Sequence, residues 1–104
     1  MIATYPNMWI FEVKDKSGRM IHLSNERWKH INQDHPEVAH HLEEIKDTLE
    51  NPVKIASYSI DENVKYYYRY FKERKSRARH LLVIVKYLNG NGFIITSYFV
   101  KSIK

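Results

Sequence analysis

The sequence contains no cysteine and very little glycine or proline. Among its 104 residues there are three glycines and three prolines. Without cysteine the chain can form neither a disulfide nor a thiolate zinc site, and catalysis by a thiol nucleophile is excluded. Hydrophobic residues make up 43% and charged residues 28%, which is typical of a folded chain rather than a disordered one. We therefore predict one domain spanning residues 1–104.

Targeting and membrane-spanning segments are also missing from the sequence. The opening residues, MIATYPNMWIFEVKDK, lack the basic region and the unbroken apolar run of a signal peptide. The missing cysteines favour a reducing cytoplasm, although they are equally compatible with secretion. We expect a cytoplasmic protein with no membrane partner.

Several catalytic motifs are absent as well. We find no Gly-rich phosphate loop, no nucleophile elbow and no paired acidic residues at metal spacing. These absences argue against nucleotide hydrolases, serine hydrolases and two-metal nucleases. His40 and Glu44 have the spacing of a metal-binding pair on a helix, but no third ligand converges with them in sequence. We therefore expect neither a catalytic metal nor another cofactor.

Acidic residues are nearly missing from the C-terminal part of the chain. Residues 1–64 hold seven Lys/Arg against eleven Asp/Glu, whereas residues 65–104 hold ten against one. The two parts carry about −4 and +9, which sum to the net charge of +5. This asymmetry favours an anionic partner such as nucleic acid. The alternative is a dipolar surface that only aids solubility.

The N-terminal half predicts a hairpin followed by two helices. Apolar alternation from Trp9 and again up to Leu23, with Ser17-Gly18 between, predicts the hairpin. Ser24 is placed to cap a first helix that runs to about Gln33. Pro36 suits the first position of a second helix. The expected buried stripe of this second helix is Val38, Leu42, Ile45 and Leu49, and Asn51-Pro52 ends the helix.

From residue 53 onward the pattern changes to strands. The expected strands are Val53–Tyr58, Val64–Phe71, Leu81–Leu88, which is apolar on both faces as a central strand would be, and Phe93–Val100. Asn89-Gly90-Asn91-Gly92 is a strong hairpin signal. We predict an α+β fold, with N-terminal helices packed on a C-terminal antiparallel sheet of three or four strands.

A run of aromatic and basic residues is the most informative part of the chain. Alternation in the strand places Tyr66, Tyr68 and Tyr70 on one face and Lys65, Tyr67, Arg69 and Phe71 on the other. The run continues into Lys72, Arg74, Lys75, Arg77 and Arg79. Arginine neutralises phosphate and tyrosine stacks on bases, so we predict that the five basic residues bind single-stranded or looped RNA. Alternatively, each tyrosine is a half-buried strand residue and the basic run is a solvated loop.

Histidine and hydroxyl residues supply candidates for proton transfer. His30 lies off the apolar stripe of the first helix, where it can act as an acid or base near neutral pH or be an ordinary surface histidine. On the last strand, Thr96 and Tyr98 are predicted to share a face with Ile94. Ser97 is predicted on the other face with Phe93, Ile95 and Phe99. Threonine is also common in strands for packing reasons.

Several short blocks in this order resemble a known superfamily. They are Ile21-His22-Leu23-Ser24-x-x-x-Trp28-x-His30-Ile31, His35-Pro36-Glu37, Ile45, Leu49-x-Asn51-Pro52, Tyr67-Tyr68-Arg69 and Ile95-Thr96-Ser97-Tyr98. Together they resemble the barnase/EndoU/colicin/RelE-like nucleases, and more narrowly their phage- and mobile-element-associated branch. The resemblance spans Ile21 to Tyr98.

The resemblance implies RNA cleavage without metal and frequent use as a toxin held in check by a partner protein. The corresponding catalytic residues would be His30, Tyr68 or Arg69, and Thr96 or Tyr98. In the implied reaction the ribose 2′-hydroxyl attacks its own 3′-phosphate. His30 would be the acid or base, Arg69 would stabilise the charged phosphorane-like state, and Thr96 and Tyr98 would orient the phosphate.

Substrate and partners stay open at this level. The RNA can be tRNA, ribosome-bound mRNA or free RNA, and an inhibitor (an antitoxin or immunity protein) would most simply be acidic. The main rival interpretation is a non-catalytic RNA-binding or regulatory module that uses the same basic face. A structural or protein-binding domain, with an acidic protein partner and no affinity for RNA, is a third.

Overall fold

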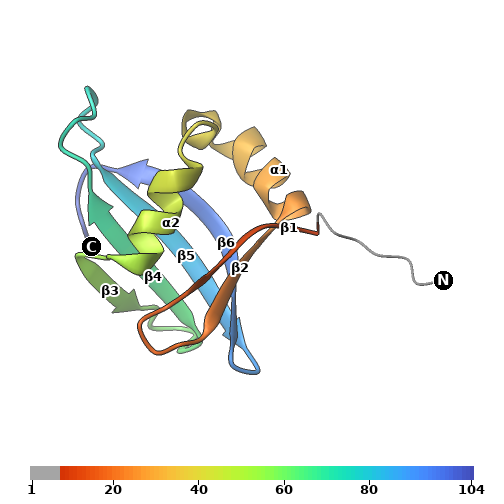
Figure 1. Cartoon of the computed structure of the whole chain (residues 1–104). Helices are drawn as coiled ribbons and strands as arrows, with labels where there is room; N and C mark the ends of the chain where they lie inside the picture. The colour runs from red at the N-terminus through yellow and green to blue at the C-terminus, as the bar shows by residue number, and fades with distance from the viewer. Residues whose placement is uncertain (1–7) are drawn as a thin grey trace.

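The computed structural model describes residues 8–104 of the chain, which form an α+β fold with one six-stranded sheet (Figure 1). Its elements are β1 (Trp9–Lys14), β2 (Met20–Ser24), α1 (Asn25–Asp34), the 3₁₀ turn η1 (Pro36–Val38), α2 (Leu42–Glu50), β3 (Lys54–Ser57), β4 (Val64–Tyr70), β5 (His80–Leu88) and β6 (Asn91–Val100). Residues 1–7 lie outside the described range. They belong to the N-terminal segment in which the sequence predicts no signal peptide. None of the helices in residues 8–104 is long and apolar enough to cross a membrane.

Helix α1 begins where its capping residue predicts. The Ser24 hydroxyl accepts a hydrogen bond from the N–H of Arg27 at 3.0 Å, which satisfies one of the unpaired donors of the first turn. The helix ends at Asp34, one residue beyond the expected end, and the N–H of His35 closes the last turn on the Ile31 carbonyl. His35 therefore lies at the junction between the helices, followed by Pro36.

The second predicted helix is interrupted. Pro36–Val38 form a 3₁₀ turn, and α2 begins only at Leu42. At His41 the backbone leaves the helical region (φ −120°, ψ 31°), and its N–H bonds to the Val38 carbonyl, three residues back. Such 3₁₀ turns are frequent at helix N-termini. The apolar stripe survives the break, because Val38, Ile45 and Leu49 are all fully buried.

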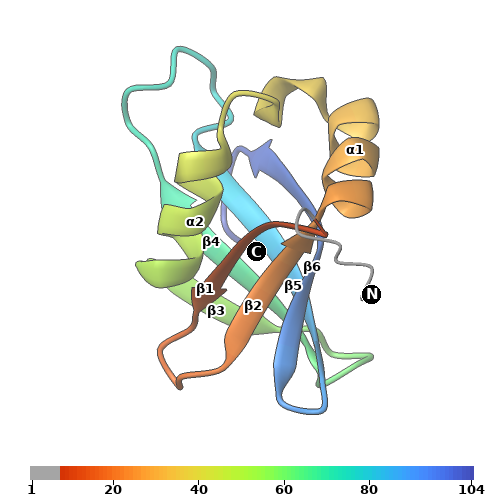
Figure 2. The same ribbon diagram turned by 45° about the vertical axis from the view of Figure 1, so that its right-hand side comes forward.

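The sheet differs from the expected C-terminal antiparallel one. The strand order is β1-β2-β6-β5-β4-β3. Strands β3 to β6 form the predicted antiparallel meander, but β2 adds to it by pairing in parallel with β6, through Ile21↔Gly92 and His22↔Phe93 (Figure 2). The N-terminal hairpin thereby joins the sheet, which is mixed and six-stranded, and the helices lie between the hairpin and the meander in sequence.

The β5–β6 hairpin depends on the backbone conformation of Asn89-Gly90 and on the small size of Gly92. Asn89 (φ 53°) and Gly90 (φ 81°) both have positive φ, the backbone required by a two-residue turn that matches strand twist. At Gly92 the reason is space. A Cβ added there would lie 2.9 Å from a ring carbon of Tyr87 and 3.0 Å from side-chain carbons of Ile21 and Val85.

We expect Gly92→Ala to destabilise the protein, because the crowding atoms belong to three buried side chains. The free energy of unfolding should fall by about 1–3 kcal/mol, as for other overpacked cores. Chemical denaturation monitored by tryptophan fluorescence measures this change. A Gly92→Ala protein as stable as wild type would show that β2 and β6 do not approach closely.

The hydrophobic core lies between the helices and one face of the sheet. Helix α2 crosses β4 and β5, while α1 lies beside β6 (Figures 1 and 2). The buried cluster unites helix residues with strand residues: Ile31, Val38, Ile45 and Leu49 with Ile21, Leu23, Tyr67, Leu81, Val83, Val85, Ile94 and Phe99. We call this side of the sheet the helix face and the opposite side the open face.

A bulge in β6 reverses the predicted facing of the two residues before it, Phe93 and Ile94. Thr96 pairs with Ile84 and Ile94 pairs with Val85, so Ile95 is an extra residue in the strand. Such a bulge shifts the alternation by one position. Ile94 is therefore in the core of the helix face with Phe99, not on the same side as Thr96 and Tyr98 as expected.

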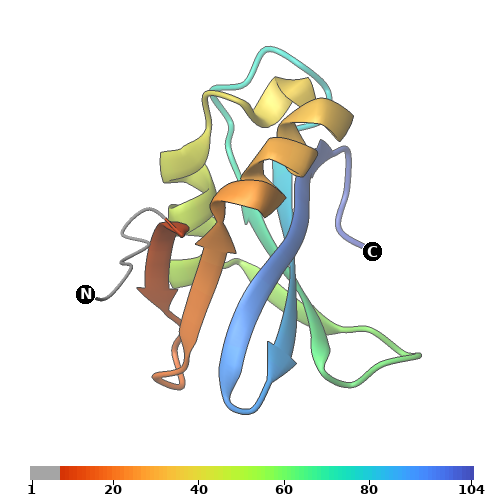
Figure 3. The same cartoon turned by 90° about the vertical axis from the view of Figure 1, so that its right-hand side faces the viewer.

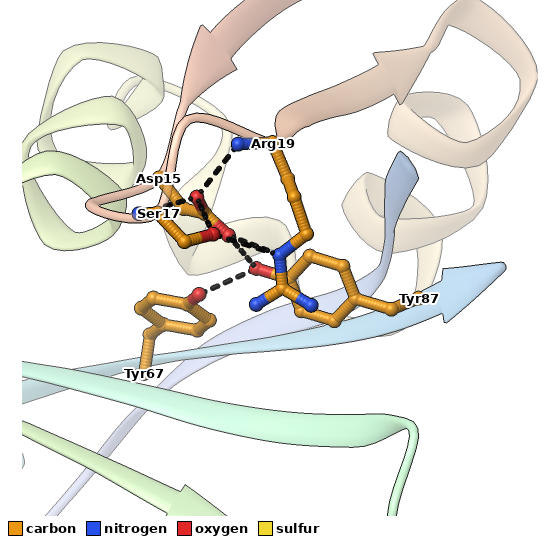
Figure 4. A network of polar contacts seen from close by, with 5 residues as sticks. All are labelled: Asp15, Ser17, Arg19, Tyr67 and Tyr87. Atoms are coloured by element: carbon orange, nitrogen blue, oxygen red, sulfur yellow. Dashed lines mark hydrogen bonds and ion pairs between the residues drawn. The ribbon is translucent and has the colours of Figure 1, made fainter. Parts of the chain in front are cut away.

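A buried polar network fixes the turn between β1 and β2 to the sheet (Figure 4). The Tyr87 hydroxyl donates to Asp15 Oδ2 at 2.9 Å, and the hydroxyls of Tyr67 and Tyr87 are 2.5 Å apart. Since the single proton of Tyr87 goes to Asp15, Tyr67 is the donor to Tyr87. Asp15 also accepts from the Ser17 hydroxyl and from Arg19 Nε, while the Arg19 guanidinium lies 3.7 Å above the Tyr87 ring.

Candidate nucleic-acid interface and active site

The open face carries a hollow of about 400 Å³ at the end of the sheet near the C-terminus. Strand register positions its residues: Leu82 of β5 stands between Tyr68 of β4 and Tyr98 of β6, and in the next row Ile84 stands between Tyr66 and Thr96. Tyr68 is only 3% exposed and forms part of the floor. The remaining lining includes Tyr58, Val100, Ser102 and Lys104. In Figure 3 the C-terminal end lies on the side of β6 away from the helices.

The tyrosines of this hollow are close enough to affect one another electrostatically. Burial raises the pKa of Tyr66, and the neighbouring phenols of Tyr58, Tyr98 and Tyr68 raise it further. The rings of Tyr58 and Tyr66 stack with centroids 5.8 Å apart. Tyr66 therefore presents an uncharged O–H at neutral pH, a donor suited to the oxygens of a phosphate group.

Among residues 8–104, His35 is the histidine whose ring packs on a tyrosine that lines the hollow. Its ring stacks on Tyr98 with centroids 4.5 Å apart and planes inclined by 20°. The His35 side chain is 31% exposed, and its Nδ1 lies 3.8 Å from a carboxylate oxygen of Glu37. A partly exposed imidazole with a nearby carboxylate, held against a phenol, is a suitable group for proton transfer.

The predicted catalytic residues are only partly brought together. Tyr68, Thr96 and Tyr98 share the open face in adjacent rows. His30 is exposed on α1, and within residues 8–104 its ring does not stack on Tyr68 or Tyr98, whereas that of His35 stacks on Tyr98. Arg69 lies on the opposite side of β4 from Tyr68, because consecutive strand residues alternate in direction.

Arg69 is held on the helix face by α2. Its Nε donates to Asp47 Oδ2 at 2.9 Å and its Nη1 to the Asn51 carbonyl at 2.6 Å. These contacts fix the guanidinium in one orientation at the end of the helix. The structure therefore does not place Arg69 beside the phosphate position that Tyr68 and Tyr98 would define.

The five predicted RNA-binding residues lie in the loop that joins β4 to β5. Arg74 Nε donates to the Ala78 carbonyl and Arg79 Nε to the Ser76 carbonyl, both at 2.9 Å. Lys72, Lys75 and Arg77 are exposed. The loop is thus folded back on itself and concentrates positive charge at the same end of the sheet as the tyrosine hollow.

A second histidine, His22, also lies on the open face of the sheet. His22 lies between Trp9 and Phe93 on the open face, with Nδ1 2.7 Å from Glu12 Oε2 and Nε2 3.2 Å from Asn91 Oδ1. Nε2 is engaged by Asn91, while the buried Nδ1 forms no hydrogen bond despite its proximity to Glu12, so His22 is less suited than His35 to exchange protons with a substrate. Within residues 8–104 there is no group of three or more His, Cys, Asp or Glu side chains that could hold a metal ion.

The sequence pattern did not single out His35 as a candidate catalytic residue. The only local signal was its place in the His35-Pro36-Glu37 block of the family resemblance. Tyr58, which stacks on Tyr66, and Lys54, which pairs with Tyr68 across β3 and β4, were also missed. Nothing in the periodicity of either segment marks these two residues, because their partners are set by strand pairing.

Comparison with known proteins identifies the family of the chain. The sequence profile of the phage-Barnase-EndoU-ColicinE5/D-RelE like nuclease2 family matches residues 11–104, nearly all of the chain. The match confirms the resemblance drawn from the short blocks and supports nuclease activity on a nucleic-acid substrate. No curated protein matches the sequence. The chain belongs to the phage-Barnase-EndoU-ColicinE5/D-RelE like nuclease2 family.

Proposed function

We propose that this protein is an endoribonuclease that cleaves RNA without a metal ion, by attack of a ribose 2′-hydroxyl on the adjacent phosphate. The observation that carries the proposal is the stacking of His35 on Tyr98, beside Tyr68 in the hollow of the open face. The reaction needs a base, a proton donor to the leaving oxygen and stabilisation of the charged phosphate, but no protein nucleophile.

The residues in the hollow and beside it can fill these roles. His35 takes or returns the proton of the reacting oxygens. Tyr98, fixed by the stack, donates its hydroxyl to a phosphate oxygen or shares in the proton transfer, while Tyr68 and Thr96 orient the phosphate. Lys54, placed opposite Tyr68 in the strand register, supplies positive charge. His30 stays the alternative acid or base predicted from the sequence.

RNA is favoured over duplex DNA by the aromatic character of the open face. Exposed bases of a single strand or loop can stack on rings such as Tyr58 and Tyr66. The basic loop, with Lys72, Arg74, Lys75, Arg77 and Arg79, then contacts the backbone. We place tRNA or mRNA, met in the cytoplasm, as the substrate class.

A free ribonuclease endangers the cell that makes it, so we further propose that this one acts as a toxin with an acidic antitoxin or immunity protein. The basic loop, which carries five positive charges and only Glu73 in opposition, is the surface such a partner would cover. Mixing the purified protein with a candidate acidic partner protein, and measuring loss of RNase activity, tests this part.

The central experiment incubates the purified protein with a single-stranded RNA in excess chelator and identifies the chemical ends of the products. We expect cleavage that leaves 2′,3′-cyclic phosphate ends, because the 2′-oxygen is the nucleophile. The matched control is the same oligonucleotide with 2′-deoxyribose at the cleaved position, which should stay intact.

The outcomes separate the competing functions. Cleavage of the deoxy control, or cleavage that stops when metal is chelated, would rule out 2′-hydroxyl attack without metal. Binding of RNA with no cleavage under any condition would favour the non-catalytic RNA-binding module, which uses the same basic and aromatic surface.

A further inference from the structure

A second cleft lies on the helix face, on the opposite side of the same strand ends from the tyrosine hollow. Its volume is about 630 Å³, and its lining includes His41, Glu44, Arg69, Lys72, Arg74 and Phe99. On β6, Phe99 faces this cleft while its neighbour Tyr98 faces the hollow. On β4, Arg69 likewise faces the cleft and its neighbour Tyr68 faces the hollow. The two sites are therefore back to back across β4 and β6.

The two arginines of the cleft are held before any ligand arrives. Arg74 Nε is engaged by the Ala78 carbonyl at 2.9 Å, and its guanidinium carbon lies 3.5 Å from the centre of the Phe99 ring. Arg69 is held by Asp47 and the Asn51 carbonyl. Side chains fixed in this way lose little conformational freedom when they bind, which favours affinity. Within residues 8–104, the Nη groups of Arg74 make no hydrogen bond to protein.

The chemistry of the lining selects a phosphate rather than a base. Phe99 is 8% exposed and is covered by Arg74, so it offers no ring face for stacking. The cleft contains four cationic side chains, with Lys75 as the fourth, against the carboxylates of Glu44 and Glu73. His41 Nδ1 lies 3.5 Å from Glu44 Oε1 but forms no hydrogen bond with it. The lining of the cleft therefore carries a net positive charge.

An aromatic rim connects the cleft to the open face. Tyr70, the last residue of β4, lines the cleft, is 45% exposed and packs against His80 of β5 with ring centroids 5.0 Å apart. A single strand leaving the tyrosine hollow can stack a base on this exposed ring as it passes the end of the sheet. Its next phosphates then face the cleft.

We propose that the helix-face cleft is a phosphate-binding subsite for single-stranded RNA, and that the strand bends over the Tyr70 end of the sheet so that both faces hold one substrate. The proposal rests on the proposed ribonuclease function for the identity of the strand. Arg74 and Lys72 contact the bound phosphate, while Arg69, paired with Asp47, forms part of the wall of the cleft.

The first test measures binding of a fluorescent 12-nucleotide RNA with 2′-O-methyl groups, which cannot be cleaved by the proposed chemistry. Arg74→Gln should weaken binding about tenfold, the loss expected for one charge-assisted contact. The slope of log affinity against log salt should fall by about 0.7, the value for one phosphate contact on a single strand. Lys16→Gln removes the same charge from the exposed β1–β2 turn and should change neither quantity.

Lys72→Gln provides a second variant whose exposed side chain is not needed for folding, and it should weaken binding in the same direction. If Arg74→Gln and Lys72→Gln, both folded by circular dichroism, bind the 12-mer with wild-type affinity and salt slope, the subsite does not exist. If binding weakens but wild type never cleaves RNA, the subsite stands and the proposed nuclease function fails.

Cleavage assays distinguish a subsite from a catalytic centre. For Arg74→Gln, the ratio of kcat/KM on a 12-nucleotide RNA to kcat/KM on a dinucleotide should fall about tenfold, since only the longer strand reaches the cleft. An equal loss of kcat on both substrates, with KM unchanged, would assign the cleft to the chemical step and overturn the proposal.

Discussion

Replacing His35 by alanine is expected to lower kcat for RNA cleavage by about a hundredfold or more, the usual contribution of a general acid or base. His35 is the histidine that contacts the tyrosine hollow, through its stack on Tyr98 at 4.5 Å. Affinity for an uncleavable RNA should stay within a few fold of wild type, because the basic loop is intact. The measurement is single-turnover cleavage together with fluorescence polarisation.

The matched control for this substitution is His30→Ala on the neighbouring helix α1. His30 is exposed, does not line the hollow and does not stack on Tyr98 in the described structure, so its loss should leave kcat within a few fold of wild type. The reverse result, with His30→Ala inactive and His35→Ala active, would restore the assignment predicted from the sequence. Tyr98→Phe keeps the ring that supports His35 but removes the hydroxyl, and thus separates stacking from proton donation.

Asp15→Ala is expected to lower the free energy of unfolding by about 3 kcal/mol, because it leaves buried donors without an acceptor. The Asp15 side chain is 3% exposed and accepts hydrogen bonds from Tyr87, Ser17 and Arg19. The melting temperature should fall by about 10–20 °C. Lys16→Ala, an exposed change in the same turn, should alter the free energy of unfolding by less than about 0.5 kcal/mol.

The same carboxylate should make stability depend on acid pH. Burial raises the pKa of Asp15, but hydrogen bonds from Ser17, Arg19 and Tyr87 outweigh it and lower the pKa from 3.8 to about 2. The folded form therefore binds the proton less tightly than the unfolded chain. The resulting stabilisation, about 2 kcal/mol, is fully present above about pH 5 and is lost as the pH falls towards 2.

Asp15→Asn tests this linkage directly, because asparagine cannot titrate. Urea denaturation at several pH values should show that the stability difference between wild type and Asp15→Asn shrinks between pH 5 and pH 2. A constant difference over that range would mean that Asp15 titrates normally in the folded protein, and that the hydrogen bonds in Figure 4 do not favour its charged form.

Local features of the chain could be predicted from the sequence because they depend on neighbours. Ser24 caps α1 through its own hydroxyl, and Asn89-Gly90 form the turn that their tolerance of positive φ allows. The meander of four C-terminal strands follows from apolar alternation and short connections. The nuclease family could also be identified from the sequence, because each of the short blocks that carry the resemblance is contiguous in the chain.

Features that depend on segments far apart in the chain were not predictable in the same way. The pairing of β2 with β6 needs the close approach that Gly92 permits, and no periodic pattern records which strands will meet. The bulge at Ile95 reversed the expected facing of Ile94, since one extra residue shifts the alternation of side chains between the two faces.

The candidate site also combines features set by local sequence with features set by contacts between distant segments. By itself, the sequence determined that tyrosines, hydroxyl groups and positive charge would gather in the C-terminal half, because composition and strand alternation are local properties. Only the tertiary structure decided that His35 rather than His30 meets Tyr98, and that Arg69 turns to Asp47 on the helix face. The junction between α1 and α2 is carried to one end of the sheet by core packing, and that packing is a property of the whole chain.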